Sequence, residues 1–362
     1  MPQRDPMNET IVLPARPRIL IVALRRLGDV LLTTPLVRSV RRQWPDARLD
    51  VLVFADTAGI LDGNPDIDRV VTMPPRPSID QSMSVAAAIF RRYDLAISTQ
   101  TGDRPTGFAL LASSRAVAPV EDRFSGRLKR RFLARAFASD ASAHRVDALL
   151  ALADVLGVPR AAEVVIPRDR QPGATPAGAF AVIHAAPMFN YKRWTIEGWR
   201  SAAAALSSRG LTVVATGGPG EAERAYLDRV WTGLDVVRLD GQCTWGELAA
   251  LLSRAKVYVG PDTSVTHLAA AAGCPTVALY GPTDPRLWGP WPAGGLREPW
   301  LASAPVQNRG NVWVVQHPFP CTPCQLEGCE RRLTSESECL NQLAPAQVIS
   351  AIEQALVLNP RQ

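Results

Sequence analysis

Short runs of β-branched and other apolar residues alternate with stretches of helical periodicity along this chain of 362 residues. This alternation predicts parallel sheets that helices cover on both faces. In the first half, we expect strands at residues 18–24, 49–54, 70–73, 95–98 and 116–120. We expect helices near 30–44, 83–93 and 143–157. In the second half, we expect strands at 180–184, 211–216, 236–239, 256–259 and 276–280. We expect helices near 196–209, 220–231, 245–254, 264–272 and 345–358.

The two series are separated by residues 171–178, which contain two prolines and two glycines and show no apolar periodicity, as is typical of a linker. We therefore expect an α/β fold class with two doubly wound, Rossmann-like domains that face a central cleft. Ligands should lie at the carboxyl ends of the strands. The expected parts are a flexible tail at 1–17, domains at 18–170 and 179–344, and a C-terminal helix at 345–362 that could pack on the first domain.

The composition excludes several classes of protein. Hydrophobic residues make up 47% of the chain and charged residues 20%, which excludes wholesale disorder. No apolar stretch reaches the roughly 18–20 residues that a membrane-spanning helix needs. The first 17 residues are polar and lack the apolar core of a secretory signal, so we predict a cytoplasmic protein.

The positive charge is unevenly distributed. The net charge is +6, and residues 1–171 contain 25 basic and 19 acidic residues, whereas residues 172–362 contain 15 of each. The excess lies in the first half, which favours an anionic partner there.

A glycine and an aspartate follow the first predicted strand. Gly28 allows a tight turn and close approach of a ligand to the backbone. Asp29 then stands at the start of the next helix, where it is either an N-cap or a functional carboxylate facing the cleft. The dinucleotide fingerprint GxGxxG is absent here, which argues against a nicotinamide enzyme.

Three segments of the second half could bind an anion. Lys192 and Arg193 can neutralise phosphate oxygens, or they belong to an ordinary solvated loop. Residues 260–267 offer hydroxyls and backbone N–H groups at a helix start, which suits a phosphate as well as a plain N-cap. The turn at 216–221 could hold a nucleotide or simply connect a strand to a helix. The candidate residues are Thr216, Gly217, Gly218, Glu221, Asp262, Thr263, Ser264, Thr266 and His267.

Residues 123–135 contain six basic residues, with Phe124, Leu128 and Phe132 at helical spacing. The pattern predicts a basic amphipathic helix that suits an anionic membrane surface or a phosphorylated lipid. The alternative is a surface helix whose apolar face lies in the core. No recognised nucleic-acid module accompanies it, so we do not expect nucleic acid. The basic candidates for acceptor or membrane contact are Arg127, Lys129, Arg130 and Arg131.

Four of the six cysteines crowd near the C-terminus, at Cys321, Cys324, Cys329 and Cys339. Four thiols so close in sequence could hold zinc or iron. The alternative is a set of reduced structural cysteines, since disulfides are disfavoured in a reducing cytosol.

Taken in order, these motifs make the chain resemble glycosyltransferase family 9, the ADP-heptose:lipopolysaccharide heptosyltransferases, over about residues 18–356. The resemblance is carried by Leu27-Gly28-Asp29-Val30 with Pro35, by Lys192-Arg193-Trp194 with Trp199, by residues 262–267 and 280–285, and by the cysteine-bearing tail.

The resemblance implies a GT-B fold and inverting, metal-independent transfer from a nucleotide-diphosphate sugar. The first domain would bind the acceptor and the second the donor. Asp29 matches the family's general base, and Lys192 matches the residue that meets the charge of the leaving diphosphate. Thr263 and Ser264 match its phosphate-binding turn, and Glu221 lies in its nucleotide-contacting loop.

The implied partners are an ADP-sugar such as ADP-heptose, an anionic lipopolysaccharide-core or other glycan acceptor, and the cytoplasmic surface of the inner membrane. Arg25 and Arg26 replace the small hydroxyl residues often found before Gly-Asp in the family, a departure that concerns acceptor contacts more than reaction class. Two alternatives remain: a nucleotide-sugar epimerase of the same architecture, and a non-catalytic protein that binds anionic membrane surfaces.

Overall fold

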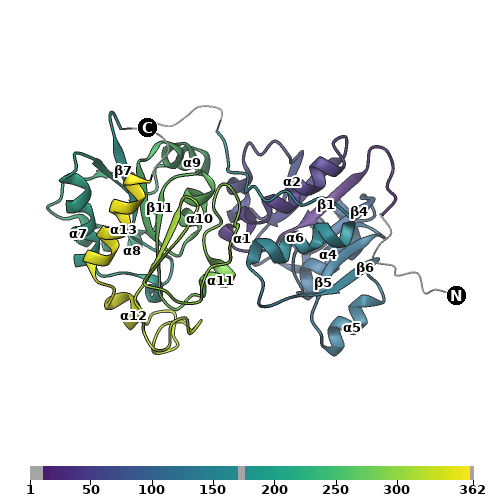
Figure 1. Cartoon of the computed structure of the whole chain (residues 1–362). Coiled ribbons are helices and arrows are strands. Elements are labelled where there is room, and N and C mark those ends of the chain that lie inside the picture. The colour runs from purple at the N-terminus through teal and green to yellow at the C-terminus, as the bar shows by residue number, and fades with distance from the viewer. Residues whose placement is uncertain (1–10, 170–175, 359–362) are drawn as a thin grey trace. The chain divides into compact units, whose positions relative to one another are not determined.

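The computed structural model describes residues 11–169 and 176–358. The chain divides into two compact units, unit 1 (Met1–Pro167) and unit 2 (Arg168–Gln362). Each unit is built on a largely parallel sheet with helices packed on it (Figure 1). The predicted α/β fold class with Rossmann-like architecture is thereby confirmed for both units. No helix among the described residues is both long and apolar enough to cross a bilayer.

Six parallel strands form the sheet of unit 1, in the order β3-β2-β1-β4-β5-β6. They are β1 (Arg18–Val22), β2 (Arg48–Phe54), β3 (Arg69–Met73), β4 (Leu95–Ser98), β5 (Ala116–Val120) and β6 (Arg135–Ala138). The strand order reverses at β1, so the connections that leave β1 and β4 run to opposite sides. Such a reversal opens a crevice at the carboxyl ends of the strands.

Both faces of this sheet are covered. The helices are α1 (Leu27–Leu31), α2 (Thr34–Gln43), η1 (Ala55–Leu61), α3 (Ile79–Ile89), α4 (Asp103–Ala112), α5 (Phe124–Arg130) and α6 (Arg145–Leu156). One core joins α3 and α4 to alternate strand residues such as Leu20 and Val22. Because strand side chains alternate in direction, Ile19 and Ile21 point to the other face, and α2 packs against α6.

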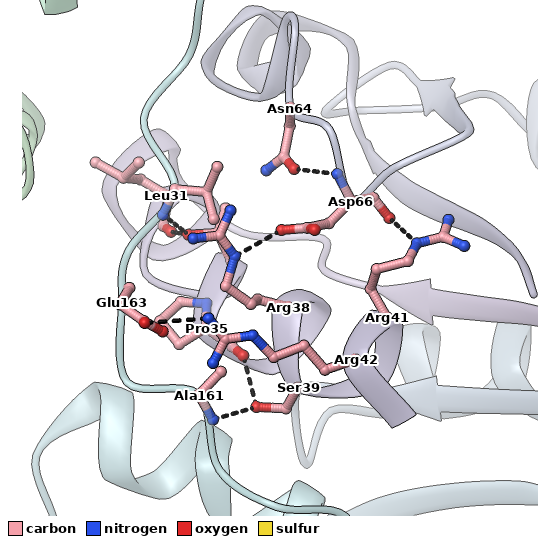
Figure 2. A network of polar contacts seen from close by, with 12 residues as sticks. Leu31, Pro35, Arg38, Ser39, Arg41, Arg42, Asn64, Asp66, Ala161 and Glu163 are labelled. Atoms are coloured by element: carbon pink, nitrogen blue, oxygen red, sulfur yellow. Dashed lines mark hydrogen bonds and ion pairs between the residues drawn. The ribbon is translucent and has the colours of Figure 1, made fainter. Parts of the chain in front are cut away.

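Polar contacts hold α2 on both of its sides (Figure 2). The Arg38 guanidinium donates to an Asp66 carboxylate oxygen at 2.9 Å. On the other side, the Ala161 N–H donates to the Ser39 hydroxyl at 2.8 Å, and Arg42 pairs with Glu163 at 3.1 Å. Because α1 leads directly into α2, these contacts also fix the position of α1.

Unit 2 contains a seven-stranded sheet in the order β12-β13-β11-β10-β7-β8-β9, parallel except for the antiparallel pair β12–β13. The strands are β7 (Phe180–His184), β8 (Thr212–Thr216), β9 (Val237–Arg238), β10 (Val257–Pro261), β11 (Thr276–Tyr280), β12 (Val306–Arg309) and β13 (Val312–Gln316). Here the order reverses between β7 and β10.

The helices of unit 2 follow the predicted alternation. They are η2 (Asn190–Lys192), α7 (Ile196–Ser207), α8 (Glu221–Trp231), α9 (Trp245–Arg254), α10 (Ser264–Ala271), α11 (Pro285–Trp288), α12 (Glu338–Asn341) and α13 (Pro345–Val357). The terminal helix, which we considered for packing on the first domain, buries Val348, Ala351, Ile352 and Ala355 in the core of unit 2. In Figure 1 this yellow helix lies beside α7.

Several elements differ from the prediction. The helix expected at 30–44 is divided into α1 and α2, and Pro35 occupies the first turn of the second piece. The helix expected at 123–135 ends at Arg130, and Arg135–Ala138 form the edge strand β6 instead. The strands β12 and β13 and the helix α4 were not predicted. The residues of β6 are only partly buried, so they lack the continuous apolar run that identified the inner strands.

Replacing Ser39 with alanine should destabilise unit 1. The Ala161 N–H would remain buried without its acceptor, which costs about 1–3 kcal/mol. Urea unfolding followed by circular dichroism measures this loss. Ser82→Ala is the matched control, because that hydroxyl donates to the Ser78 carbonyl oxygen at an exposed site. Equal free energies of unfolding for the two variants would contradict the assigned role of Ser39.

Candidate functional site

Asp29 lies where the strand order of unit 1 reverses. It belongs to the first turn of α1, which follows β1. The N-cap of α1 is Arg26, and no side chain caps this helix, so the capping interpretation of Asp29 is not what the structure shows. The Asp29 side chain is only 10% exposed and is therefore a nearly buried carboxylate at the carboxyl edge of the sheet.

Two arginines converge on this carboxylate. The Arg145 Nε atom lies 3.1 Å from Asp29 Oδ1, and the Arg25 Nε atom lies 4.0 Å from the same oxygen. Arg145 is the first residue of α6, and its side chain is 12% exposed. Burial lowers the pKa of Arg145, and the opposite charge of Asp29 counteracts this shift. Paired in this way, both groups can remain charged away from bulk water.

Sequence reasoning missed Arg145. Its position at the start of the helix after β6 puts it on the carboxyl side of the sheet, as for Asp29, but β6 itself was not predicted, so no sequence signal identified Arg145. Gly28, which we grouped with the nucleotide-binding residues, also lies here, beside Asp29 in α1. All other members of that group belong to unit 2.

Lys192 and Asp262 form an ion pair where the strand order of unit 2 reverses. Lys192 closes η2 after β7, and Asp262 follows β10, the neighbouring strand. Burial alone would raise the pKa of Asp262, but the Lys192 ammonium and the nearby His267 hold it below its usual value. The Tyr280 hydroxyl, which donates to the Trp288 carbonyl oxygen at 2.7 Å, lies 3.4 Å from the other oxygen of Asp262. The carboxylate therefore stays ionised and orients the lysine.

The first turn of α10 stands next to this pair. Thr263 is the N-cap, and its side chain makes no capping hydrogen bond. The N–H groups of a first helical turn have no partner inside their own helix, and they favour an anion together with the helix dipole. Thr263 and Ser264 are half-buried, so their hydroxyls can reach a ligand at this turn.

Thr266, by contrast, supports the turn from within. It is fully buried. Its hydroxyl donates to the Pro261 carbonyl oxygen and lies 2.9 Å from the Tyr258 hydroxyl. We had counted Thr266 among the donor-binding residues, but in the structure it fixes the conformation of the turn that carries Thr263.

The glycine-rich turn at 216–221 is held by two contacts. The Gly218 N–H donates to Glu223 Oε1 at 2.6 Å, and the Thr216 hydroxyl lies 3.1 Å from His184 Nδ1. A Cβ atom on Gly217 would lie 2.4 Å from Leu227, so a larger residue does not fit there. Glu221, the predicted nucleotide contact, is the exposed first residue of α8. Glu223, which we did not single out, shapes the turn.

The neighbours of Lys192 belong to the core. The Trp194 indole N–H donates to the Leu343 carbonyl oxygen at 2.9 Å, and its ring meets Trp199 edge-on at 5.1 Å. The Arg193 guanidinium lies 4.4 Å from the centre of the Tyr226 ring. These contacts anchor the loop. The Lys192 ammonium, which pairs with Asp262, is 22% exposed and can reach a ligand.

The cysteine-bearing segment, residues 321–339, braces the loops on either side of the ion pair. The Ser337 hydroxyl donates to the Tyr191 carbonyl oxygen at 2.7 Å, and the Asn190 amide donates to the Thr334 carbonyl oxygen at 3.1 Å. The Gln325 N–H donates to the Pro282 carbonyl oxygen at 2.7 Å. The segment therefore supports both the Lys192 loop and the loop after β11.

The metal site that we considered at Cys321, Cys324, Cys329 and Cys339 does not fit the structure. These thiols are free, and residues 11–169 and 176–358 contain no cluster of three or more histidine, cysteine or acidic side chains suited to a metal ion. Cys339 is buried, and burial raises the pKa of its thiol to about 11. The structural alternative, a set of reduced cysteines, agrees with these free thiols.

The basic residues of α5 divide into two groups. Arg127, Arg130 and Arg131 are exposed. Lys129 turns inward, where its ammonium pairs with Asp103 at 2.7 Å and donates to the Thr101 carbonyl oxygen. Lys129 is therefore a structural contact of unit 1 rather than part of the exposed surface that we predicted.

Comparison with known proteins gives a consistent picture. The family model of glycosyltransferase family 9 (heptosyltransferase) matches residues 83–295, which is more than half of the chain. Lipopolysaccharide heptosyltransferase 1 of Pseudomonas aeruginosa is 28% identical, over 95% of this chain and 99% of its own length. Lipopolysaccharide heptosyltransferase 3 of Escherichia coli is 27% identical, over 74% of this chain and 84% of its own.

Solved structures share the fold. A family 9 glycosyltransferase of Veillonella parvula has a TM-score of 0.79 at 21% identity, covering 97% of this chain and 100% of its own. The Escherichia coli heptosyltransferase WaaC with ADP has a TM-score of 0.71 at 22% identity, covering 93% of this chain and 99% of its own. The iron-containing dodecameric glycosyltransferase TibC of enterotoxigenic Escherichia coli has a TM-score of 0.58 at 18% identity, covering 96% of this chain and 78% of its own. These structures confirm the GT-B fold.

Breaking the Asp29–Arg145 pair should cost stability. In Arg145→Met, the nearly buried carboxylate loses its close cation, and we expect the free energy of unfolding to fall by about 2–3 kcal/mol, since water and Arg25 offset part of the loss. Asp29→Asn in the same background should restore part of it. Arg160→Met removes an exposed pair with Asp154 and should change stability by less than about 0.5 kcal/mol. Chemical unfolding of all four proteins makes the comparison.

Acid should weaken unit 2 through His184. Burial lowers the pKa of His184 from 6.5 to about 4, so the folded state keeps it neutral. The contribution of neutral His184 to the free energy of unfolding is complete above pH 6.5 and is lost as the pH falls toward 4. In this range the unfolded chain binds a proton at His184 and the folded chain does not. Between pH 7.5 and 5.0, the wild-type protein should lose roughly 2 kcal/mol more than His184→Gln. Parallel losses in urea titrations of the two proteins would refute this.

Proposed function

The chain belongs to glycosyltransferase family 9, the heptosyltransferase family, and from this membership we propose that it transfers a heptose from an ADP-sugar to a lipopolysaccharide-core acceptor. The relatives support this substrate class, because two of them are named lipopolysaccharide heptosyltransferases and a third has been solved with ADP. Unit 1 binds the acceptor in this proposal, and unit 2 binds the donor.

One observation carries the proposal. Each unit has a charged group of opposite sign at the reversal point of its own sheet: the Asp29 carboxylate after β1 and the Lys192 ammonium after β7. Glycosyl transfer to a hydroxyl needs both kinds of group, since a proton must leave the acceptor and negative charge grows on the leaving diphosphate.

Asp29 is the general base in this mechanism. Its Oδ1 atom faces the two arginines, which orients the carboxylate so that the other oxygen can accept a proton. As the acceptor oxygen forms its bond to the anomeric carbon, the bond from that carbon to the diphosphate breaks and the hydroxyl proton passes to Asp29. A single displacement of this kind inverts the anomeric configuration.

Lys192 and the first turn of α10 stabilise the leaving group. Lys192 is held by Asp262 at 22% exposure, so its ammonium is oriented but still accessible to a diphosphate. Thr263, Ser264 and the adjacent backbone N–H groups add donors in a fixed geometry. Donors oriented before the reaction cost no reorganisation when charge develops. We propose that these groups suffice without a divalent metal ion.

The turn at 216–221 holds the nucleoside of the donor. It begins where β8 ends, next to the loop after β7, and Gly217 and Gly218 let the turn pack closely on Leu227 and Glu223. Glu221 stands exposed at the start of α8, where its carboxylate can accept hydrogen bonds from ribose hydroxyls.

The acceptor side carries positive charge. Residues 1–171 hold 25 basic against 19 acidic residues, which suits a lipopolysaccharide core with its phosphates and acidic sugars. We propose that the enzyme works in the cytoplasm, at the surface of the inner membrane that carries this acceptor.

Two variants separate the roles. Asp29→Asn should lower kcat about 10²–10⁴-fold and leave the Kd for ADP within about twofold, because Asp29 belongs to unit 1 whereas ADP binds to unit 2 in this proposal. Lys192→Met should lower kcat about 10²–10³-fold and also weaken ADP binding. Transfer assays with ADP-heptose and calorimetry with ADP measure these values.

Matched controls are Asp80→Asn, at an exposed aspartate that also lies in a first helical turn, and Lys256→Met, at one of the three lysines of the chain. Both should keep near wild-type kcat. If Asp29→Asn retained more than about a tenth of the activity, Asp29 would not be the base. A wild-type protein that neither binds nor turns over any nucleotide-diphosphate sugar would overturn the proposed function.

A further inference from the structure

The helix α5 has its apolar residues on the outside. Phe124 and Leu128 of α5, and Phe132 in the turn that follows it, recur at every fourth residue, and their exposed fractions are 83%, 52% and 64%. A surface helix normally turns such a stripe toward the core. Here the stripe faces solvent, so the core cannot explain its apolar character.

The inner side of α5 explains this orientation. Gly126 is buried, and a Cβ atom there would lie 1.9 Å from the Glu121 carbonyl oxygen, so the helix packs through bare backbone on the residue that directly follows β5. Lys129 binds inward to Asp103 and Thr101. A glycine and a paired lysine thus hold α5 against β5 and β6, and the apolar residues remain on the outer face.

Arginines surround this stripe. Arg123, Arg127, Arg130 and Arg131 are exposed, and the acidic residues between positions 121 and 132 are Glu121 and Asp122. Lys129 is neutralised within the unit by Asp103. The outer face of α5 therefore combines three large apolar side chains with four arginines against two carboxylates.

We propose that this face, the α5 surface (Phe124, Leu128, Phe132, Arg123, Arg127, Arg130 and Arg131), docks on an anionic phospholipid bilayer. Apolar and aromatic side chains enter the boundary between headgroups and acyl chains, while arginines bind phosphate oxygens in pairs of hydrogen bonds. The seven residues of α5 are too few to cross a bilayer, so the helix would lie in the plane of the interface.

The lipid surface is favoured over other occupants by the mixture of groups. A purely acidic partner would need the arginines but not the exposed aromatic rings, and a second copy would bring four more arginines against the same arginines. An anionic bilayer satisfies both kinds of group at once. The inference rests on the proposed function in one respect, because the proposed acceptor is carried by a lipid. Binding to a lipid surface requires no sugar transfer, so the two can be tested separately.

Sedimentation of the full-length protein with vesicles tests the proposal. Vesicles of equal parts phosphatidylglycerol and phosphatidylcholine should bind the wild-type protein at least tenfold more tightly than pure phosphatidylcholine, and salt should weaken this binding. Phe124→Ser/Phe132→Ser and, separately, Arg127→Gln/Arg130→Gln/Arg131→Gln should each reduce binding at least tenfold. Equal binding to both vesicle types, or wild-type binding by both α5 variants, would overturn it.

Controls keep the outcomes distinct. Leu301→Ser/Val357→Ser changes two exposed apolar residues of unit 2 and should leave vesicle binding unchanged. Light scattering without lipid asks whether the wild-type protein self-associates and whether Phe124→Ser/Phe132→Ser abolishes that association. Such a result would assign the α5 surface to a second copy instead.

Activity on a delipidated, water-soluble acceptor separates this inference from the proposed function. Phe124→Ser/Phe132→Ser should transfer to that acceptor at the wild-type rate, which also shows that the variant is folded. If the wild-type protein binds anionic vesicles but transfers no sugar, the proposed function fails and the docking surface stands. If it transfers sugar but ignores the vesicles, the reverse holds.

Discussion

The reversal of strand order in each sheet is the constraint on which the candidate chemistry depends. At β1 in unit 1, and between β7 and β10 in unit 2, neighbouring connections leave to opposite sides and expose the carboxyl ends of the strands. Asp29, Lys192 and Asp262 all follow these strands. The fold thus gathers charged side chains at the one edge of each sheet where backbone connections do not cover them.

Keeping charge at a nearly buried edge requires a partner for each group. Asp29 has Arg145, and Lys192 has Asp262, so neither charge is desolvated alone. Pairing also prepares each group for its proposed role. In the proposed mechanism, Arg145 orients the carboxylate for its role as base, and Asp262 orients the ammonium for binding the diphosphate. The electrostatic cost of removing a charge from water therefore explains both the pairing of these residues and their fixed orientation.

The sequence was sufficient for the inner strands and for most loops that carry chemistry. Strands such as β7, β10 and β11 are mostly apolar, and Asp29, Lys192 and Asp262 could be placed in the loops or helix starts that follow predicted strands. It was insufficient where three-dimensional contact decides. Arg145 meets Asp29 from a helix more than a hundred residues later, and the outer strand β6 has no apolar run. Thr266 resembled a ligand-binding hydroxyl until its bond to the Pro261 carbonyl oxygen was seen.

Orientation was the second property that spacing could not supply. The spacing of Phe124, Leu128 and Phe132 correctly predicts a helix, although the helix ends at Arg130, before Phe132. Which side faces inward is decided by Gly126 and Lys129. The cysteine-bearing segment follows the same logic. Its closely spaced thiols suggested metal ligands, whereas backbone and hydroxyl contacts from Ser337 and Gln325 make it a brace for the Lys192 loop. In both cases a group that stands out in the sequence, the apolar stripe or the cysteines, is positioned by close packing contacts of other residues. These residues are Gly126 and Lys129 in α5, and Ser337 and Gln325 in the cysteine-bearing segment.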